Sequence, residues 1–216
     1  MSAPQTPPGD TVPRIAEARP PAEPSSPEQH ARQSRILRAA AHMGAEKGLE
    51  RVQMHEVARA AGVAIGTLYR YFPSKTHLFT AVMADLIDRF DESLPEPRPG
   101  TSPEDAVGDV LVSASRRLLR NPALATAMLQ SANAAGATAV ADAVRIDTTF
   151  RGIILRVLGI GEPTEQDVTL VRLLLQCWYG VLQSSLNGRA SLAGTEGDIR
   201  LACRLLLAPR SNAARS

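Results

Sequence analysis

The segment GVAIGTLYRYFPSK, residues 62–75, decides the fold of this chain. It places two tyrosines, an arginine and a threonine close to two glycines, and a proline separates them from a lysine. Glycine allows the left-handed backbone of a tight turn and proline interrupts a helix, so the segment predicts a short helix between two sharp turns. A packed core has no need of this mixture of side chains, whereas a surface that contacts something negatively charged does.

Basic residues gather around this segment. Between positions 30 and 75, eight Lys and Arg stand against three Glu, a net charge of +5. The whole chain of 216 residues carries only +2, so the remainder carries −3. A basic segment on a slightly acidic body is typical of a nucleic-acid-binding module.

The sequence as a whole predicts an all-α protein. Aromatic residues make up only 4% of the chain, and apolar residues recur at spacings of three and four. No segment has the pattern of a strand. We expect about nine helices, with these approximate bounds: 28–48, 54–61, 64–72, 74–94, one ending near 120, one beginning at 122, 138–158, 163–186 and 194–207.

Composition divides the chain into parts. Half of the 16 prolines lie within the first 27 residues, which hold almost no large apolar side chain, so this arm is expected to be disordered. The arm is either an inert tail or a segment that touches DNA through Arg14 and Arg19, its only cations. The expected parts are a disordered arm at 1–27, a DNA-binding domain at 28–75, a second helical domain at 76–210 and a disordered tail at 211–216.

Two short helices joined by Gly62-Val63, behind a longer first helix, predict a helix-turn-helix. The second short helix of such a motif enters the DNA major groove, with its N-terminal half toward the bases. On this helix Leu68 and Phe72 are expected to face inward. The residues expected to face outward are Ile65, Gly66, Thr67, Tyr69 and Arg70.

The outward residue types suit a DNA groove. Gly66 lets the backbone approach closely, and Ile65 offers an apolar contact to a thymine methyl group. Thr67 can bond a base edge or a phosphate, and Arg70 can make a bidentate contact to guanine.

Phosphate contacts are expected from side chains around these residues. Tyr69 and Tyr71 carry hydroxyl groups on rigid rings that suit phosphate oxygens. Lys75 stands in the first turn of the next predicted helix, where a cation opposes the helix dipole. A phosphate at that helix N-terminus would reverse the sign, so Lys75 is expected to bind the DNA backbone.

The stretch from Arg51 to Phe79, RVQMHEVARAAGVAIGTLYRYFPSKTHLF, resembles the signature of the TetR family of bacterial transcriptional regulators. The matching pieces are EVARAAGV, GTLYRYF and SK, in the order and at the spacing of the family. Gln53 and Ala64 depart from the threonine and serine that often cap the second and third helices of the family. These two departures put two phosphate contacts in doubt, because neither residue caps a helix well.

The resemblance implies a DNA-binding surface and continues into the second domain. The segments RNPALATAM, GEPTEQD and RLACRLLLA are similar to the KstR-like, steroid-catabolism branch of the family. The implied DNA-binding residues are Gln53, Met54, Ala64, Ile65, Gly66, Thr67, Tyr69, Arg70, Tyr71 and Lys75.

Family membership further implies that the second domain binds a small apolar effector and forms a homodimer through its last two long helices. The effector would be steroid-like or an acyl-CoA. Its pocket is expected among Met83, Ile87, Phe90, Met128, Phe150, Ile154, Gln176, Trp178 and Tyr179, and Asn133 is a further polar candidate. The dimer interface is expected at Leu170, Leu174, Leu182, Leu201 and Leu205.

The sequence therefore predicts a ligand-responsive repressor of a palindromic DNA operator. A transcriptional activator of the same fold and a helical protein-interaction module are the alternatives. We find no catalytic constellation, no metal motif and no dinucleotide loop, so neither an enzyme nor a cofactor is expected. Without a secretory signal or an apolar run long enough to cross a bilayer, the protein is expected in the cytoplasm, away from membranes. Cys177 and Cys203 are expected to be buried free thiols.

Overall fold

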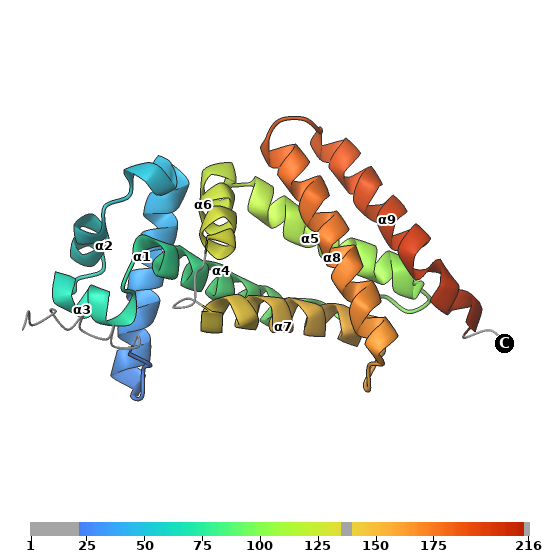
Figure 1. The fold of residues 1–216 in the computed structure, drawn as a ribbon, viewed down its shortest axis with the longest axis horizontal. Helices are drawn as coiled ribbons and strands as arrows, with labels where there is room; N and C mark the ends of the chain where they lie inside the picture. Colours follow the sequence, from blue (N-terminus) through green and yellow to red (C-terminus); the bar gives the residue numbers. More distant parts are fainter. Residues whose placement is uncertain (1–21, 135–139, 214–216) are drawn as a thin grey trace, which may run out of the picture.

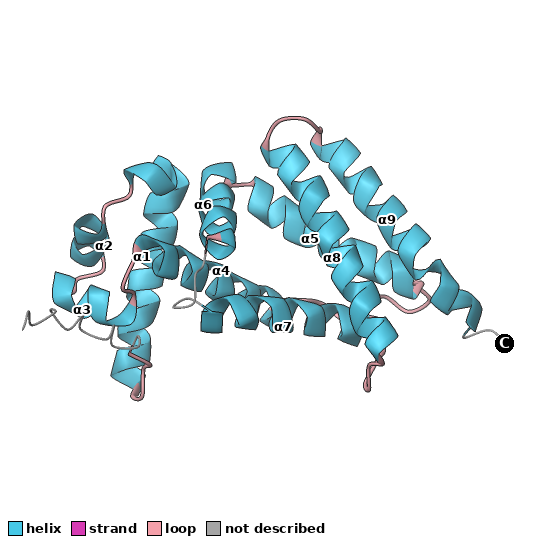
Figure 2. Cartoon of the chain, in the orientation of Figure 1, coloured by secondary structure: helices cyan, strands magenta, loops and turns pink. Residues whose placement is uncertain are grey.

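The fold consists of helices packed around two hydrophobic cores, in a computed structural model that describes residues 22–134 and 140–213 (Figure 1). All regular structure in these two stretches is helical, which confirms the all-α prediction (Figure 2). The helices are α1 (Pro27–Arg51), α2 (Met54–Ala60), α3 (Ile65–Tyr71), α4 (Lys75–Glu92), α5 (Pro103–Leu119), α6 (Pro122–Asn133), α7 (Val140–Val157), α8 (Glu165–Leu186) and α9 (Leu192–Ala213).

Two glycines predicted to end helices do so through a left-handed backbone. At Gly48 (φ 71°) the helical geometry of α1 breaks, and the chain makes one more turn before Arg51. Gly62 (φ 66°) follows α2. A residue with a Cβ atom adopts such angles only at a cost, which is why glycine at these positions could be interpreted from sequence alone.

Two boundary predictions need correction at the ends of the chain. The predicted arm overlaps the start of α1, because this helix begins at Pro27 and Ser26 caps it by accepting from the Gln29 N–H. The predicted tail begins too early, because α9 continues to Ala213. Residues 1–21 and 214–216, on which the rest of the two predictions falls, lie outside the described residues.

Helix α4 connects the two hydrophobic cores. The first core lies among α1, α2, α3 and the start of α4, and also takes in Leu124 and Met128 of α6. The second core lies among α5, α7, α8, α9 and the end of α4, where Phe90 is buried. Met83, near the middle of α4, packs against both cores. In Figure 1, α4 accordingly runs from the first three helices on the left toward the bundle on the right.

Gly44 marks the point where α1, α4 and α6 meet. A Cβ atom at this position would lie 2.6 Å from Cε1 of Phe79 on α4 and 2.9 Å from Cδ1 of Leu124 on α6. Both distances are shorter than real Cβ contacts, so only the missing side chain lets the three helices approach so closely.

Replacing Gly44 by alanine should therefore destabilise the protein. Steric overlap with Phe79 and Leu124 should outweigh the better helix propensity of alanine and cost about 1–3 kcal/mol, measured by urea denaturation. The matched control is Gly152→Ala in α7, where the added Cβ meets nothing within 4 Å. That change should raise the free energy of unfolding by about 0.5–1 kcal/mol. Equal changes in the free energy of unfolding for the two substitutions would contradict the close packing of α1, α4 and α6 at Gly44.

Candidate nucleic-acid interface and effector-binding core

The turn between α2 and α3 holds these two helices at a fixed angle. Beyond the end of α2, the Gly62 N–H donates to the carbonyl of Arg59 and the Val63 N–H to that of Ala58. This pair of bonds is the Schellman arrangement at a helix C-terminus. Val63 packs against the first core, and Arg35 of α1 donates its Nε–H to the Ala61 carbonyl at 3.3 Å. The turn is thus held by hydrogen bonds to the end of α2 and by a hydrogen bond from α1.

One face of α3 is open to solvent. Ile65 is 42% exposed and Tyr69 48% exposed, and Arg70 and Gly66 are exposed as well. Nothing lies within 4 Å of the place where a Cβ of Gly66 would be, so another molecule can approach the backbone there. Thr67 is half-buried at the edge of this face. The structure thus brings four of the predicted contact residues together on one exposed surface, with the fifth at its rim.

Tyr71 lies on the opposite face of α3, which corrects its prediction as a phosphate contact. It is only 3% exposed and belongs to the first core. Residues three apart share a helix face, so Tyr71 follows Leu68 inward. The side-chain chemistry of the hydroxyl suggested a surface role, but its angular position on the helix decides otherwise. The buried Tyr71 hydroxyl has no hydrogen-bond partner among the described residues.

The exposed guanidinium of Arg70 lies near the buried ring of Tyr71. The Cζ atom of Arg70 is 5.5 Å from the centre of the ring. A cation within about 6 Å of an aromatic face is attracted to it. Tyr71 therefore supports the arginine expected to contact DNA, instead of contacting DNA itself.

Met54 also points inward. It is 9% exposed and packs in the first core with Val57 and Ala58, three and four residues further along α2. Its predicted role as a DNA contact is therefore wrong. By contrast, Gln53 and Ala64 are exposed, and neither provides a side-chain cap to its helix, as the sequence predicted.

Lys75 has partners within the chain. Its Nζ donates to the carbonyl of Leu49 at 2.9 Å and to that of Glu50 at 3.3 Å, both in the last turn of α1. The side chain is half-buried. The sequence placed this ammonium in the first turn of α4, which is confirmed, but it did not predict that the side chain reaches back to α1.

Lys47, at the end of α1, also has a partner within the protein. The Lys47 ammonium donates to Glu56 at 2.9 Å, and this hydrogen bond lowers the pKa of the Glu56 carboxyl. Arg35, Arg38 and His42 line a groove of about 310 Å³ between α1 and the end of α2. The basic charge of the segment is thus spread over α1 as well as over the helix-turn-helix.

Several of the predicted pocket residues meet in the second core. Phe150 stacks on Trp178 with ring centres 5.0 Å apart and faces Phe90 at 6.4 Å. Ile154 is buried beside them, and Ile87 and Tyr179 are partly buried against the same core. Met128 instead packs in the first core with Leu124, and Met83 packs against both cores.

Two polar groups lie inside or beside this aromatic core. Trp178 donates its Nε1–H to Ser115 at 2.8 Å, and the Ser115 hydroxyl donates to the Leu111 carbonyl. The Trp178 ring is therefore fixed by a buried hydrogen bond. Arg117 of α5 lies over the outer ring of the stack, 4.9 Å from the centre of Phe90.

The hydroxyl of Tyr179 collects the polar side chains near the core. It accepts from Asn133 Nδ2 at 2.5 Å and from Gln183 Nε2 at 2.7 Å. Gln176, which was predicted as a polar residue of the effector pocket, is instead exposed on another side of α8. Sequence reasoning missed Gln183, although its position four residues after Tyr179 on the same helix could have indicated it.

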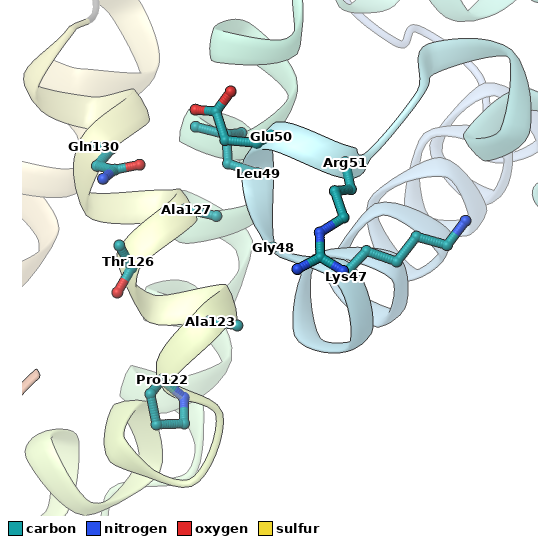
Figure 3. Close-up of a pocket in the computed structure, with 10 residues that line it drawn as sticks. All are labelled: Lys47, Gly48, Leu49, Glu50, Arg51, Pro122, Ala123, Thr126, Ala127 and Gln130. Atoms are coloured by element: carbon teal, nitrogen blue, oxygen red, sulfur yellow. The ribbon is translucent and has the colours of Figure 1, made fainter.

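A separate open cleft of about 520 Å³ lies between the end of α1 and α6 (Figure 3). Lys47, Gly48 and Arg51 form one side, and Pro122, Thr126 and Gln130 form part of the other. None of the predicted pocket residues lines it. The cleft is therefore distinct from the aromatic core.

The predicted dimer residues fall into two groups. Leu174 and Leu182 are fully buried in the second core, so they cannot contact a partner, and this part of the prediction is wrong. Leu201 is 48% exposed and Leu205 67% exposed, four residues apart on α9. Leu170 is half-buried.

Two further residues of α8 were misplaced or missed by the sequence pattern. Leu173, absent from the predicted set, is 44% exposed. Cys177, predicted to be buried, is exposed. Cys203 is buried as predicted, and burial raises the pKa of its thiol to about 11. Neighbouring residues on a helix point about 100° apart, so an error of one residue explains why Leu174 was predicted at the interface in place of Leu173.

No group of His, Cys, Asp and Glu among the described residues could hold a metal ion. Within the same stretches of the chain, no helix is long and apolar enough to cross a membrane.

Comparisons with known proteins agree with this architecture. Residues 36–82 match the family model of bacterial regulatory proteins of the tetR family, and residues 100–206 match the tetracyclin repressor-like C-terminal domain. The HTH-type transcriptional repressor KstR of Rhodococcus jostii is 34% identical over 183 residues, covering 85% of this chain and 86% of that protein. KstR of Mycobacterium tuberculosis is 33% identical, covering 98% of this chain and 96% of its own length.

A solved structure extends the likeness to three dimensions. The crystal structure of a TetR transcriptional regulator from Rhodococcus sp. RHA1 has 59% sequence identity and a TM-score of 0.78. The match covers 85% of this chain and 98% of that one.

The buried position of Tyr71 predicts that its hydroxyl is dispensable. Tyr71→Phe should keep the affinity for duplex DNA, and it should raise the free energy of unfolding by up to about 1 kcal/mol, because an unpaired buried hydroxyl is lost. The matched control is Tyr69→Phe, which removes an exposed hydroxyl from the same helix and should weaken DNA binding while leaving stability unchanged. Electrophoretic mobility shift and thermal denaturation measure the two effects. A loss of DNA affinity in Tyr71→Phe alone would show that the inward placement is wrong.

Proposed function

This chain belongs to the TetR family of bacterial regulatory proteins, and from that premise we propose that it represses transcription by binding a palindromic operator as a homodimer. A small apolar effector bound in the second core releases the operator. The protein works by binding alone, without catalysis, in the cytoplasm where its DNA lies. The relatives named KstR are repressors by name, which supports the sign of regulation.

The observation that carries this proposal is the exposed face of α3. This seven-residue helix gathers an exposed isoleucine, an exposed tyrosine and an exposed arginine on one face. These side chains suit the edges of bases and the phosphates of a DNA major groove. Gly66, without a side chain in this surface, lets the helix sit close to the duplex.

The roles of the individual residues follow from their positions. Arg70 reads a guanine, with its guanidinium steadied by the Tyr71 ring. Ile65, at the first position of α3, touches a thymine methyl group, and Tyr69 bonds a phosphate. Thr67 is half-buried and reaches only what lies at the edge of the surface.

The effector acts through α4. This helix follows α3 after only Phe72, Pro73 and Ser74, and it contributes side chains to both hydrophobic cores. A ligand that enters between Phe90 of α4 and the aromatic rings of α7 and α8 shifts α4, and α4 shifts the helix-turn-helix. The ligand can change the affinity for DNA only by its own difference in affinity for the two states.

The effector is bulky and apolar, steroid-like or an acyl-CoA. Three stacked rings and Ile154 provide an apolar wall, and the Tyr179 hydroxyl with Asn133 provides a polar group to orient the ligand. If such a ligand binds the protein tightly but leaves the affinity for the operator unchanged, this mechanism is wrong.

The decisive experiment selects duplexes from a random DNA library with the purified full chain at near-physiological salt. An enriched palindrome bound by dimers is the expected result. Arg70→Ala should then relax the base preference at one position of each half-site, with a loss of about 1–3 kcal/mol there, measured by mobility shift with substituted operators. Salt-sensitive binding without any enriched sequence would remove the proposal that α3 reads bases.

The exposed leucines of α9 predict the dimer interface. Leu201→Glu with Leu205→Glu places two carboxylates in an apolar contact and should convert the dimer to monomers in sedimentation experiments. Operator affinity should fall with it, since both half-sites must be bound together. The matched control is Val144→Glu on α7, which is 53% exposed but lies on another helix, and should leave the dimer intact. Dissociation by the control alone would place the interface elsewhere.

A further inference from the structure

The chain that precedes α1 is attached to the end of α3. The Ala22 N–H donates to the carbonyl of Arg70 at 2.9 Å, and Ala22 packs against the first core. The last carbonyls of a helix have no partner within the helix, so the bond from Ala22 satisfies one of them. Four residues further on, Ser26 caps α1. The segment 22–26 thus runs from the end of α3 to the start of α1.

This attachment fixes the place from which residues 1–21 leave the DNA-binding domain. These residues lie outside the described part of the chain, but their covalent connection is to Ala22. Its partner Arg70 is the residue proposed to read guanine, so the arm starts at the backbone of a DNA contact. In the proposed complex the N-terminal half of α3 lies toward the bases, and its C-terminal end lies at the edge of the major groove. The arm therefore starts beside the phosphates that separate this groove from the neighbouring minor groove.

The two arginines of the arm stand at positions that match the distance to this minor groove. Arg19 lies three residues before Ala22, and Arg14 lies eight residues before it. An extended proline-rich chain rises about 3.1 Å per residue, so the two arginines reach about 9 Å and about 25 Å from Ala22. The centre of the minor groove lies half a helical repeat, about 17 Å, from the centre of the major groove. This distance falls between the reach of Arg19 and that of Arg14.

The composition of the arm favours the minor groove over the phosphates. Asp10 and Glu17 balance the two arginines, so the side chains of residues 1–21 carry no net charge to attract them to the DNA backbone. A minor groove about 6 Å wide excludes a helix but admits an extended chain, and six of these residues are prolines. Where the groove is narrow, its negative potential is strong enough to attract single arginine side chains.

We propose that the arm binds the minor groove next to each half-site, with Arg14 and Arg19 inserted where this groove is narrow. The bond between Ala22 and Arg70 fixes the end of the arm at α3, so that one protomer contacts the major groove and the adjoining minor groove together. Runs of A·T pairs have narrow minor grooves, so the arm selects A·T pairs beside those that α3 contacts. The inference rests on the proposed operator binding.

The test uses the full chain and three forms of the selected operator, which differ only in the base pairs beside those contacted by α3. These flanking pairs are A·T, G·C or inosine·C. Inosine lacks the 2-amino group of guanine, so inosine·C resembles A·T in the minor groove and G·C in the major groove. In mobility shift experiments, we expect the wild type to bind A·T and inosine·C flanks equally, and G·C flanks at least about fivefold more weakly.

Arg14→Gln with Arg19→Gln removes both cations of the arm. This double variant should bind all three operators equally, with the affinity of the wild type for G·C flanks. The matched control is Arg120→Gln with Arg189→Gln, which removes two exposed arginines from the second domain and should keep the wild-type preference. Both substitutions of the test variant precede Ala22 and lie outside the two cores, so its midpoint of thermal denaturation should equal that of the wild type.

Each alternative result decides against the inference. Equal binding of the three operators by the wild type would mean that nothing reads the flanking minor groove. Weak binding of inosine·C flanks would place the reading in the major groove, and a flank preference that persists in the double variant would exclude the two arginines. If the wild type has no flank preference and the double variant loses about 0.9 of salt slope per arginine, the arm binds phosphates instead. These results leave the proposed function intact, whereas a wild-type protein that enriches no palindrome overturns both.

Discussion

The fold depends on one constraint, which is that α4 belongs to two hydrophobic cores at once. Its first half is buried with the DNA-binding helices through Leu78, Phe79 and Val82, and its far end is buried in the second core through Phe90. A helix held at both ends cannot change its tilt without moving side chains in both cores, because protein interiors are packed without spare room. Gly44 makes the constraint stricter, since α1 lies so close to Phe79 of α4 and Leu124 of α6 there that a side chain would overlap both. The two parts of the molecule are therefore mechanically connected, even though each has its own core.

The short DNA-binding helices lack side-chain caps at their N-termini, whereas carbonyls at their C-termini accept hydrogen bonds from other segments. Neither Gln53 nor Ala64 provides a side-chain cap, so the first N–H groups of α2 and α3 gain nothing from these side chains. The carbonyl ends, in contrast, each receive a donor from a distant segment. Helices of only seven residues are marginal by themselves. Their stability has to come from tertiary packing and from these long-range bonds, and this also fixes their orientation.

The second core stabilises the helical bundle and is also the proposed binding site of the effector, and these two roles conflict. Phe90, Phe150 and Trp178 stack on one another and stabilise the bundle, and they are also the walls proposed for an effector. A ligand that enters there has to replace contacts that already stabilise the fold. In the proposed mechanism, part of its binding energy is spent on moving α4. The hydrogen bond from Trp178 to buried Ser115 limits how far that ring can move. In the proposed mechanism, the displacement therefore falls mainly on Phe90 and α4.

The sequence by itself determined the helical class, the two helix ends at Gly48 and Gly62, and the motif from residue 51 to 79 with its family. Local rules suffice for these features, because a left-handed turn needs glycine and an amphipathic helix needs a period of 3.6. Sequence also placed Ile65, Tyr69 and Arg70 on the open face of α3. Only the tertiary structure decided that Tyr71 is buried, that Lys75 bonds the last carbonyls of α1, that Gln183 bonds the Tyr179 hydroxyl, and that Leu173 is exposed while Leu174 is not. The physical reason is the same in each case: these outcomes depend on which distant segment packs against a given side of a helix, and a residue's type and local spacing do not contain that information.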